Sequence, residues 1–179
     1  MSAHNDRVRQ LLVKQELSEL LWAFSRAVDR GDAEAIASLF HDGAIIDTGV
    51  IREERKNFAR EYVEWSRQNA RTLFHLNSNE HFEIDKRRAR GESYIFALSA
   101  LGTSTADRFD YYATGGRYLD RFEKRRGTWR FTERRFVLDT TIRIGSADVA
   151  TIVAQASGML TGRSDDEDPS FDFWRQRDA

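Results

Sequence analysis

Hydrophobic positions recur at helical spacing in the first part of the chain. Between residues 6 and 30 apolar side chains return every three or four positions, which predicts an amphipathic helix that ends at Gly31. These positions are Val8, Leu11, Leu12, Leu20, Leu21, Phe24 and Val28. A short helix over 32–40 with Asp32 as its N-cap, a short strand over 44–47 and a third helix over 52–71 are expected to follow.

After residue 71 the pattern changes to strand-like alternation. Segments 72–84, 88–102, 109–124 and 128–144 are predicted strands, and the turns at 85–87 and 125–127 fit hairpin connections. Consecutive hairpin-linked strands indicate a strongly curved antiparallel sheet. With the helices gathered in front, the predicted class is α+β: a cone-shaped sheet capped by N-terminal helices, whose open mouth would hold a ligand.

The chain is predicted to form one domain over residues 1–144 and a C-terminal extension over 145–179. The extension contains a possible small-residue helix over 148–160 and an acidic, turn-like stretch. Three aromatic residues follow it: Phe171, Phe173 and Trp174. Aromatic side chains in a polar tail indicate docking, either on the same chain or on a neighbouring subunit.

Composition removes several classes of function. The 28 basic and 29 acidic residues give a net charge of -1, which argues against a general nucleic-acid binder. No apolar stretch is long enough for a membrane span, and the start lacks the apolar core of a secretion signal, so we expect a cytoplasmic protein. There is no cysteine. Dinucleotide, P-loop and serine-hydrolase motifs do not occur, and we expect neither a cofactor nor a metal.

The strand around His75 carries the candidate chemistry. Leu73, His75, Asn77 and Asn79 share one face, and Phe74, Leu76, Phe82 and Ile84 share the other. Two orientations are open: the polar set either lines a cavity or faces water. His81 lies about 20 Å from His75 along an extended strand, too far to bind one ion with it, and is expected to be structural or exposed.

Asp29 stands at the end of the first predicted helix. A carboxylate there opposes the helix dipole, so local physics does not favour it. It is either an exposed acid beside a turn or a carboxylate that points into the cone and orients a histidine.

Several motifs together resemble the SnoaL-like branch of the nuclear transport factor 2-like superfamily. They are a long helix ending V-D-R-G-D, a short helix ending L-F-x-D-G-A, a strand F-H-L-N-S-N and a hairpin G-G-R-Y-L-D-R-F-E-K-R-R-G-T-W-R-F. The likeness covers residues 6 to 144. It is closest to the group of scytalone dehydratase, hexachlorocyclohexane dehydrochlorinase and bile-acid dehydratase, and it implies a helix-capped curved sheet with a deep pocket.

The resemblance also implies roles for individual residues. Asp29 and His75 match the aspartate–histidine pair of the enzymes in this group. A pocket arginine falls at Arg134, with Arg135 as the alternative. The Tyr or Lys donor of the family is replaced here by Phe24, and Tyr112 or Tyr118 is a candidate replacement.

Alternation predicts the wall of the pocket. One strand would contribute Tyr94, Phe96, Leu98 and Ala100, the next Tyr112, Thr114, Gly116 and Tyr118, and the helices Trp22, Phe24 and Phe58. The Gly115-Gly116 pair in a central strand suggests room for a ligand or a close neighbour. Such an apolar, aromatic wall suits a hydrophobic cyclic small molecule.

The preferred hypothesis is a small lyase of the dehydratase or dehydrohalogenase type, with His75 as base and Asp29 orienting it. The alternatives are an isomerase or cyclase that uses the same pocket, and a noncatalytic ligand-binding member of the fold. A homodimer or homotrimer is also expected. The outer face of the sheet would offer it the apolar residues Phe74, Leu76, Phe82, Ile84, Tyr111 and Leu119.

Overall fold

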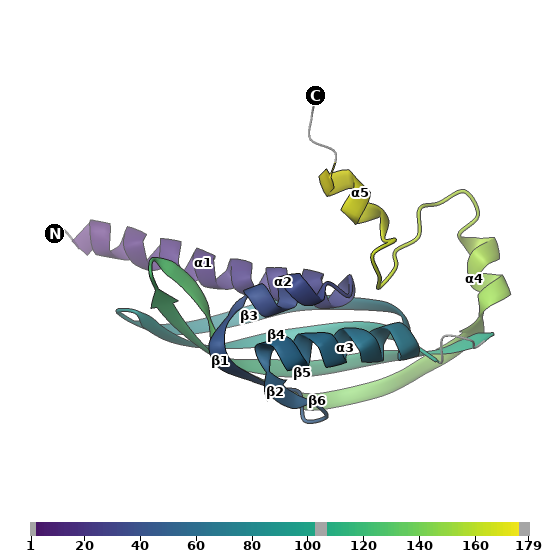
Figure 1. Cartoon of the computed structure of the whole chain (residues 1–179), viewed down its shortest axis with the longest axis horizontal. Coiled ribbons are helices and arrows are strands. Elements are labelled where there is room, and N and C mark those ends of the chain that lie inside the picture. The colour runs from purple at the N-terminus through teal and green to yellow at the C-terminus, as the bar shows by residue number, and fades with distance from the viewer. Residues whose placement is uncertain (1–2, 103–106, 176–179) are drawn as a thin grey trace.

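Six strands form one curved sheet, and three helices pack on one of its faces. The computed structural model describes residues 3–102 and 107–175 (Figure 1). In chain order the elements are α1 (Ala3–Asp29), α2 (Ala33–Ser38), β1 (Phe40–Asp47), β2 (Arg52–Glu54), α3 (Arg55–Asn69), β3 (Ala70–Asp85), β4 (Arg88–Leu101), β5 (Arg108–Arg125), β6 (Thr128–Asp148), α4 (Val149–Gln155) and α5 (Pro169–Arg175). The predicted α+β class and the curved, helix-capped sheet are confirmed.

The sheet has the strand order β2-β1-β6-β5-β4-β3. Strands β3 to β6 pair antiparallel with their chain neighbours, as predicted. β1 pairs parallel with β6, which the hairpin pattern did not indicate. The third helix starts later than predicted, because residues 52–54 form β2 and pair with the end of β1.

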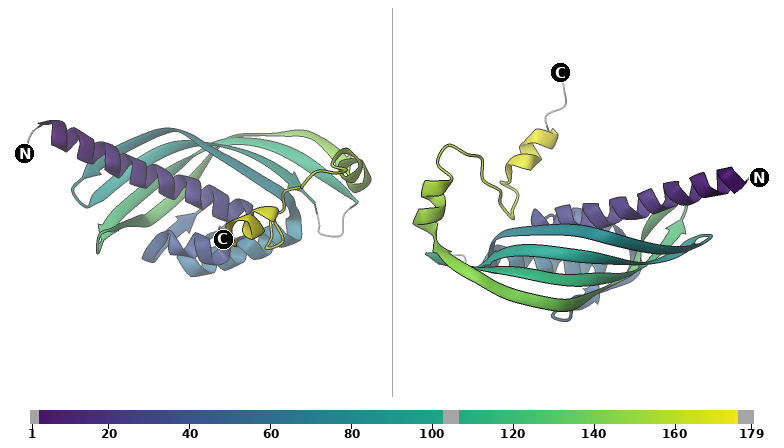
Figure 2. Two further views of the ribbon diagram at one scale, coloured as in Figure 1. Left: turned by 90° about the horizontal axis from the view of Figure 1, so that it is seen from above. Right: turned by 180° about the vertical axis from the view of Figure 1, so that it is seen from behind.

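Aromatic side chains fill the space between the helices and the sheet. Phe24 of α1 meets Phe40 and Phe131 edge-on, with ring centroids 5.8 and 6.4 Å apart. Phe131 also packs on Phe122 of β5, at 4.8 Å. This cluster holds α1 across one face of the sheet. Among the described residues no helix covers the opposite face, as the view from behind shows (Figure 2).

A β-bulge in β3 changes which side chains face the core. The pairing with β4 shifts between Ser78 and His81, and Asn79 in the bulge has a φ of 47°. Beyond the bulge, Phe82 is buried and Ile84 packs against the core. The assignment of these two residues to the outer face is therefore wrong, because simple alternation does not continue through a bulge.

The C-terminal extension returns to the domain after β6. Ser164 is buried, and its Oγ accepts a hydrogen bond from the backbone N–H of Leu73 at 3.1 Å. Asp168 pairs with Arg30 at 2.9 Å, just after α1. Gly31 is approached so closely that a Cβ there would lie 2.7 Å from the Ser164 carbonyl oxygen. Residues 164–168 are thus anchored on the same chain.

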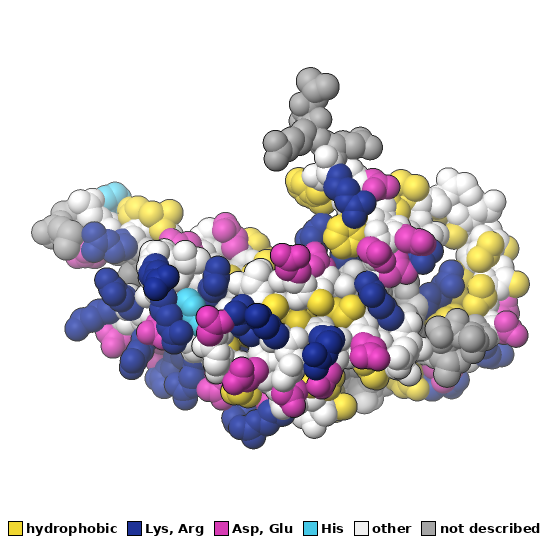
Figure 3. All heavy atoms as spheres, in the orientation of Figure 1, with side chains coloured by type: hydrophobic (Ala, Val, Ile, Leu, Met, Phe, Trp, Pro, Cys, Tyr) yellow, Lys and Arg dark blue, Asp and Glu magenta, His cyan; other side chains and the backbone are white. Residues whose placement is uncertain are grey.

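The surface mixes both signs of charge. In the space-filling view acidic and basic side chains alternate over the helical side, and hydrophobic ones gather over α4 and α5 (Figure 3). The helix predicted over 148–160 ends at Gln155, and Asp148 caps it by accepting from the Thr151 N–H at 2.7 Å. None of the described helices is long and apolar enough to cross a membrane.

Candidate active site

A row of polar side chains joins α1 to strand β3. Ser18, Trp22, Ser25 and Asp29 recur on α1 at steps of four, three and four, so they share one helix face. Ser18 and Trp22 both donate to the Glu80 carboxylate, the Trp22 indole at 3.1 Å. Ser25 bonds the amide of Asn77, and Asp29 bonds His75. His75 and Asn77 of the polar set therefore face the helices, which settles the orientation that alternation left open. Asn79 does not follow them: it is exposed in the bulge, and Glu80 faces α1 in its place.

Asp29 holds His75 through two separate contacts. Its Oδ1 lies 2.5 Å from the imidazole Nδ1, and its Oδ2 accepts the backbone N–H of His75 at 3.0 Å. The His75 and Asp29 side chains are only 13% and 9% exposed. Since Nδ1 faces a carboxylate, the neutral ring carries its proton on Nδ1 and leaves the Nε2 lone pair free. No group among the described residues bonds Nε2.

The end of α1 places the carboxylate. Gly31 has a φ of 61°, and the backbone N–H of Asp32 bonds the Ala27 carbonyl at 3.0 Å, which closes the helix after Asp29. The helix dipole disfavours an anion at this end by several tenths of a kcal/mol. The hydrogen bonds from the His75 imidazole and the β3 backbone offset that cost. His75 therefore accounts for the stability of a carboxylate at this end of the helix.

His75 opens into an apolar cavity of about 310 Å³ between α3, the β1–β2 turn and the sheet. Its lining is mostly apolar and aromatic, with a few hydroxyl groups. The residues are Thr48, Val50, Ile51, Tyr62, Trp65, Leu73, His75, Ile95, Ala97, Ser99, Leu101, Thr114, Tyr118 and Phe136. This size is at the lower end for small-molecule sites, and the lining fits a ring system better than a phosphate or a sugar.

Two tyrosines of the lining have unusual hydroxyl groups. Burial raises the pKa of Tyr118 from 10.0 to about 12, although Arg134 opposes the rise. Burial also raises the pKa of Tyr62, with smaller contributions from Tyr118 and Asp29. Neither hydroxyl has a hydrogen-bond partner within residues 3–102 and 107–175. Both remain protonated at neutral pH and are available as donors to a ligand.

Arg134 lies behind the cavity wall. Its guanidinium forms two bonds to the Asp120 carboxylate, at 2.8 and 2.7 Å, and both side chains are 1% exposed. The rings of Phe24, Tyr118 and Phe131 surround it at 4.1 to 4.3 Å from its central carbon. The structure does not bring Arg134 into the cavity. Arg135, the alternative, is half exposed on the opposite face.

Of the predicted site residues, the structure brings His75, Thr114 and Tyr118 to the cavity, with Asp29 directly behind His75. Phe24 and Phe58 are buried in the core, and Trp22 is half exposed on α1. Tyr112 and Leu98 are outside the lining. A Cβ at Gly116 would lie 2.6 Å from the Phe136 ring, so the room that glycine leaves is filled by Phe136 and not by a ligand.

The prediction of which β4 residues form the pocket wall was wrong. Tyr94 and Phe96 are 46% exposed on the bare face, Ala100 is buried outside the lining, and Ile95, Ala97, Ser99 and Leu101 line the cavity instead. Both faces of β4 are apolar here, so alternation fixed the two sets but not their direction. Tyr62 and Trp65 also line the cavity but were not predicted as site residues. Their helical spacing with Phe58 places the three side chains on one face of α3, which is the signal that could have found them.

The fold is a curved, mostly antiparallel sheet with helices on one face, and it holds an aspartate–histidine pair beside an apolar cavity. These features define a class of helix-capped cone domains. A family model described as a SnoaL-like domain matches residues 9–135. The chain belongs to this SnoaL-like family. Comparison with curated proteins gives no significant match.

Solved structures share the fold at low sequence identity. A type 2 hexachlorocyclohexane dehydrochlorinase (LinA) is 15% identical with a TM-score of 0.69, over 78% of this chain and 93% of its own. A proposed scytalone dehydratase of Novosphingobium aromaticivorans is 18% identical with a TM-score of 0.65, over 78% and 92%. A Nostoc punctiforme protein with a cystatin-like fold is 20% identical with a TM-score of 0.60, over 72% and 92%.

Proposed function

We propose that the protein is a cofactor-independent lyase that removes a proton from carbon and expels a β-leaving group from a hydrophobic cyclic substrate. The observation that carries this proposal is the His75–Asp29 pair, held at 2.5 Å with the imidazole opening into an apolar cavity. A fixed base facing a carbon skeleton in a poorly solvated site is the arrangement that proton abstraction requires. A noncatalytic binder would have no need of it.

In the proposed reaction, Nε2 of His75 takes the proton, and the C–H electron pair forms the new double bond. Asp29 stabilises the imidazolium that results and keeps the ring in the correct tautomer. The β-hydroxyl then leaves with its bonding electrons and accepts a proton from the imidazolium, so that water departs and His75 returns to its neutral form. A positioned base contributes about 10²–10⁴-fold to such a step.

Tyr118 supplies the hydrogen-bond donor that Phe24 lacks. Its protonated hydroxyl would bond an oxygen of the substrate and stabilise negative charge that develops there. Tyr62 on α3 can act with it from the other side of the cavity. Two such donors favour a substrate oxygen, and therefore loss of water, over loss of halide. In this proposal Arg134 acts indirectly, by holding the Tyr118 ring.

The test is turnover of a panel of steroids, bile acids and cyclic hydroxyketones, followed by mass and by absorbance of the conjugated product. His75→Ala should lose about 10²–10⁴-fold in turnover. His81→Ala is the matched control, because His81 is on the same strand but faces away from the cavity. A product of unchanged mass would indicate an isomerase, and full activity of His75→Ala would exclude His75 as base.

A further inference from the structure

Asp29 and His75 each occupy a weakly constrained position in the fold. Asp29 is the last residue of α1, and helix ends fray. His75 lies on β3 at one edge of the sheet, so its strand has a neighbouring strand on one side only. A contact of 2.5 Å between two such positions is stable only if the end of the helix is held against the edge of the strand.

Two amides on the outer edge of β3 bond to side chains, where an inner strand would bond to a neighbour. The His75 N–H donates to Asp29 Oδ2 at 3.0 Å, and the Leu73 N–H donates to Ser164 Oγ at 3.1 Å. Leu73 and Ser164 are both buried. A buried N–H without an acceptor destabilises a fold, so Ser164 supplies at this point the partner that the edge strand lacks. The C-terminal extension therefore holds β3 two residues before the histidine.

The same part of the extension holds the end of α1. Arg30, the residue directly after Asp29, pairs with the Asp168 carboxylate at 2.9 Å. The next residue, Gly31, lies so close to the Ser164 carbonyl oxygen that a Cβ would come within 2.7 Å of it. Residues 164–168, which we call the clasp, thus contact α1 and β3 within two residues of each member of the pair.

Asp168 fixes the shape of the clasp. Its carboxylate is buried and accepts from the backbone N–H groups of Arg163 at 2.8 Å and Ser170 at 3.0 Å, and from Ser170 Oγ at 2.5 Å. Burial raises the pKa of Asp168, but the hydrogen bonds from Ser170 and Arg163 and the charge of Arg30 outweigh this effect and lower it. Asp168 is therefore ionised at neutral pH and binds Arg30 as an ion pair.

We propose that Ser164 and Asp168 are positioning residues, which set the distance between Asp29 and His75 by tying the end of α1 to the edge of β3. This inference rests on the function proposed for the pair. Neither Ser164 nor Asp168 lines the cavity, so the clasp acts on the geometry of the base and not on substrate binding. Its loss should lower kcat by up to about 10²-fold, the effect of a misplacement of about 1 Å, and leave KM near the parent value.

The experiment is proton NMR with hydrogen exchange on the full chain and on Ser164→Ala and Asp168→Asn. Two protons report on the pair: the His75 amide and the proton between His75 Nδ1 and Asp29. Both variants should speed the exchange of these protons by at least about 10-fold, because the helix end and the strand separate more often. The amide of Phe122, in the core on β5, should keep the parent rate.

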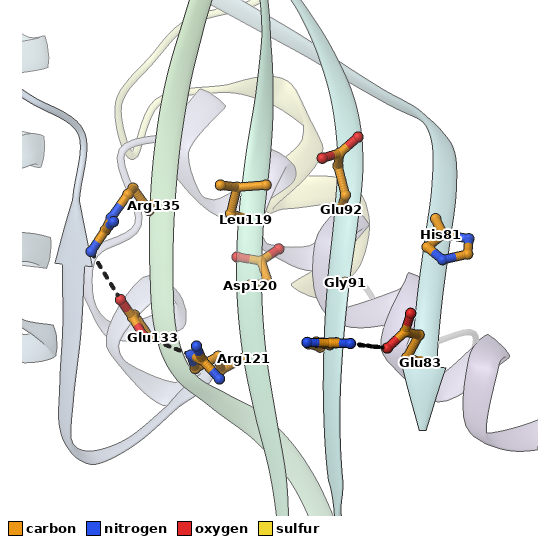
Figure 4. Close-up of a pocket in the computed structure, with 10 residues that line it drawn as sticks. His81, Glu83, Gly91, Glu92, Leu119, Asp120, Arg121, Glu133 and Arg135 are labelled. Carbon is orange, nitrogen blue, oxygen red and sulfur yellow. Dashed lines mark hydrogen bonds and ion pairs between the residues drawn. The ribbon is translucent and has the colours of Figure 1, made fainter. Parts of the chain in front are cut away.

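Two further variants are matched controls. Asp172→Asn makes the same chemical change on α5, beyond the clasp, where the Asp172 side chain is 77% exposed. Glu83→Gln removes a carboxylate from β3 itself. Glu83 lies in a charged hollow on the face of the sheet away from the helices, where it accepts from Arg90 at 2.7 Å (Figure 4). Neither control should change the exchange of the two His75 protons.

The proposal is overturned if the variants are folded by circular dichroism and exchange at His75 keeps the parent rate. It is also overturned if the His75 and Phe122 amides accelerate equally, since the clasp would then contribute only to global stability, or if either control accelerates His75. Ser164→Ala, the milder change, decides alone if Asp168→Asn does not fold.

The exchange readout needs no substrate, so it separates the clasp from the proposed reaction. Faster exchange at His75 together with parent kcat on a substrate from the panel would contradict the catalytic role of the pair and leave the clasp in place. Unchanged exchange in the clasp variants, with turnover lost in His75→Ala, would overturn the clasp and leave the proposed reaction standing.

Discussion

Removing either partner of the buried Arg134–Asp120 pair should destabilise the protein strongly. Both side chains are 1% exposed, and two hydrogen bonds of 2.8 and 2.7 Å join them. Asp120→Asn would leave a guanidinium without a counter-charge among three aromatic rings. Arg134→Met would leave a buried carboxylate in the same position. Loss of one partner of a buried pair costs about 3–5 kcal/mol of unfolding free energy.

Replacing both partners together should cost much less. In Asp120→Leu/Arg134→Met no charge remains to desolvate, and the Met side chain can still pack on Phe24, Tyr118 and Phe131. Apolar replacement of a complete buried pair is often neutral or stabilising. The double variant should therefore lie within about 1–2 kcal/mol of the parent. The two single changes should thus be far from additive.

Urea and thermal unfolding measure these differences. For a chain of this size 1 kcal/mol corresponds to about 2–4 °C in Tm, so each single variant should melt roughly 6–20 °C lower. The folded double variant should keep most of its turnover, because Arg134 does not reach the cavity and a Met side chain in its place can still pack on the Tyr118 ring. If the single changes lowered the free energy of unfolding by less than about 1 kcal/mol, the assigned burial of the pair would be refuted. A folded double variant with a turnover loss of about 100-fold would show that Arg134 takes part in the reaction.

Three further outcomes follow from the geometry. Gly116→Ala should lower the free energy of unfolding by about 1–3 kcal/mol, because its Cβ would lie 2.5 Å from the Val137 carbonyl oxygen and 2.6 Å from the Phe136 ring. Gly115→Ala should lower it less, since its Cβ would meet only a threonine methyl at 3.3 Å, and urea unfolding compares the two variants. Burial raises the pKa of Tyr118 to about 12, so the stability that its neutral hydroxyl contributes below pH 10 should be lost as pH rises from about 10 to 12. In Tyr118→Phe the free energy of unfolding should decrease less over the same pH range. Nitrogen NMR should find the neutral His75 ring protonated on Nδ1; a proton on Nε2 would contradict the assigned tautomer.

The sequence predicted the order of the long elements and the central pair, but it did not predict β2 or α5. Helical and strand-like periods are strong signals over long segments, and they located β3 to β6 to within a few residues. The pairing of Asp29 with His75 came from the family resemblance. The residues alone gave only a hint, namely an acid at the helix end where the dipole opposes it.

The sequence did not predict correctly which face of the sheet several side chains point to. On β4 both alternating sets are apolar, so the pattern could not tell Tyr94 and Phe96 from Ile95 and Ala97. On β3 the bulge at Asn79 reverses the alternation, and a single residue in left-handed conformation gives little warning of it. Arg134 matched a family position, but its burial beside Asp120 depends on contacts between strands that no local pattern reports.

The most direct test of the proposed site is a double-mutant cycle on His75 and Asp29, measured as kcat/KM on a substrate that the panel yields. If the two residues act as one base, Asp29→Asn and His75→Ala should each lose about 10²–10⁴-fold, and the double variant should lose about as much as His75→Ala alone. Losses that multiply in the double variant would show that Asp29 and His75 contribute separately. Near-parent kcat/KM in Asp29→Asn would show that His75 needs no orienting carboxylate.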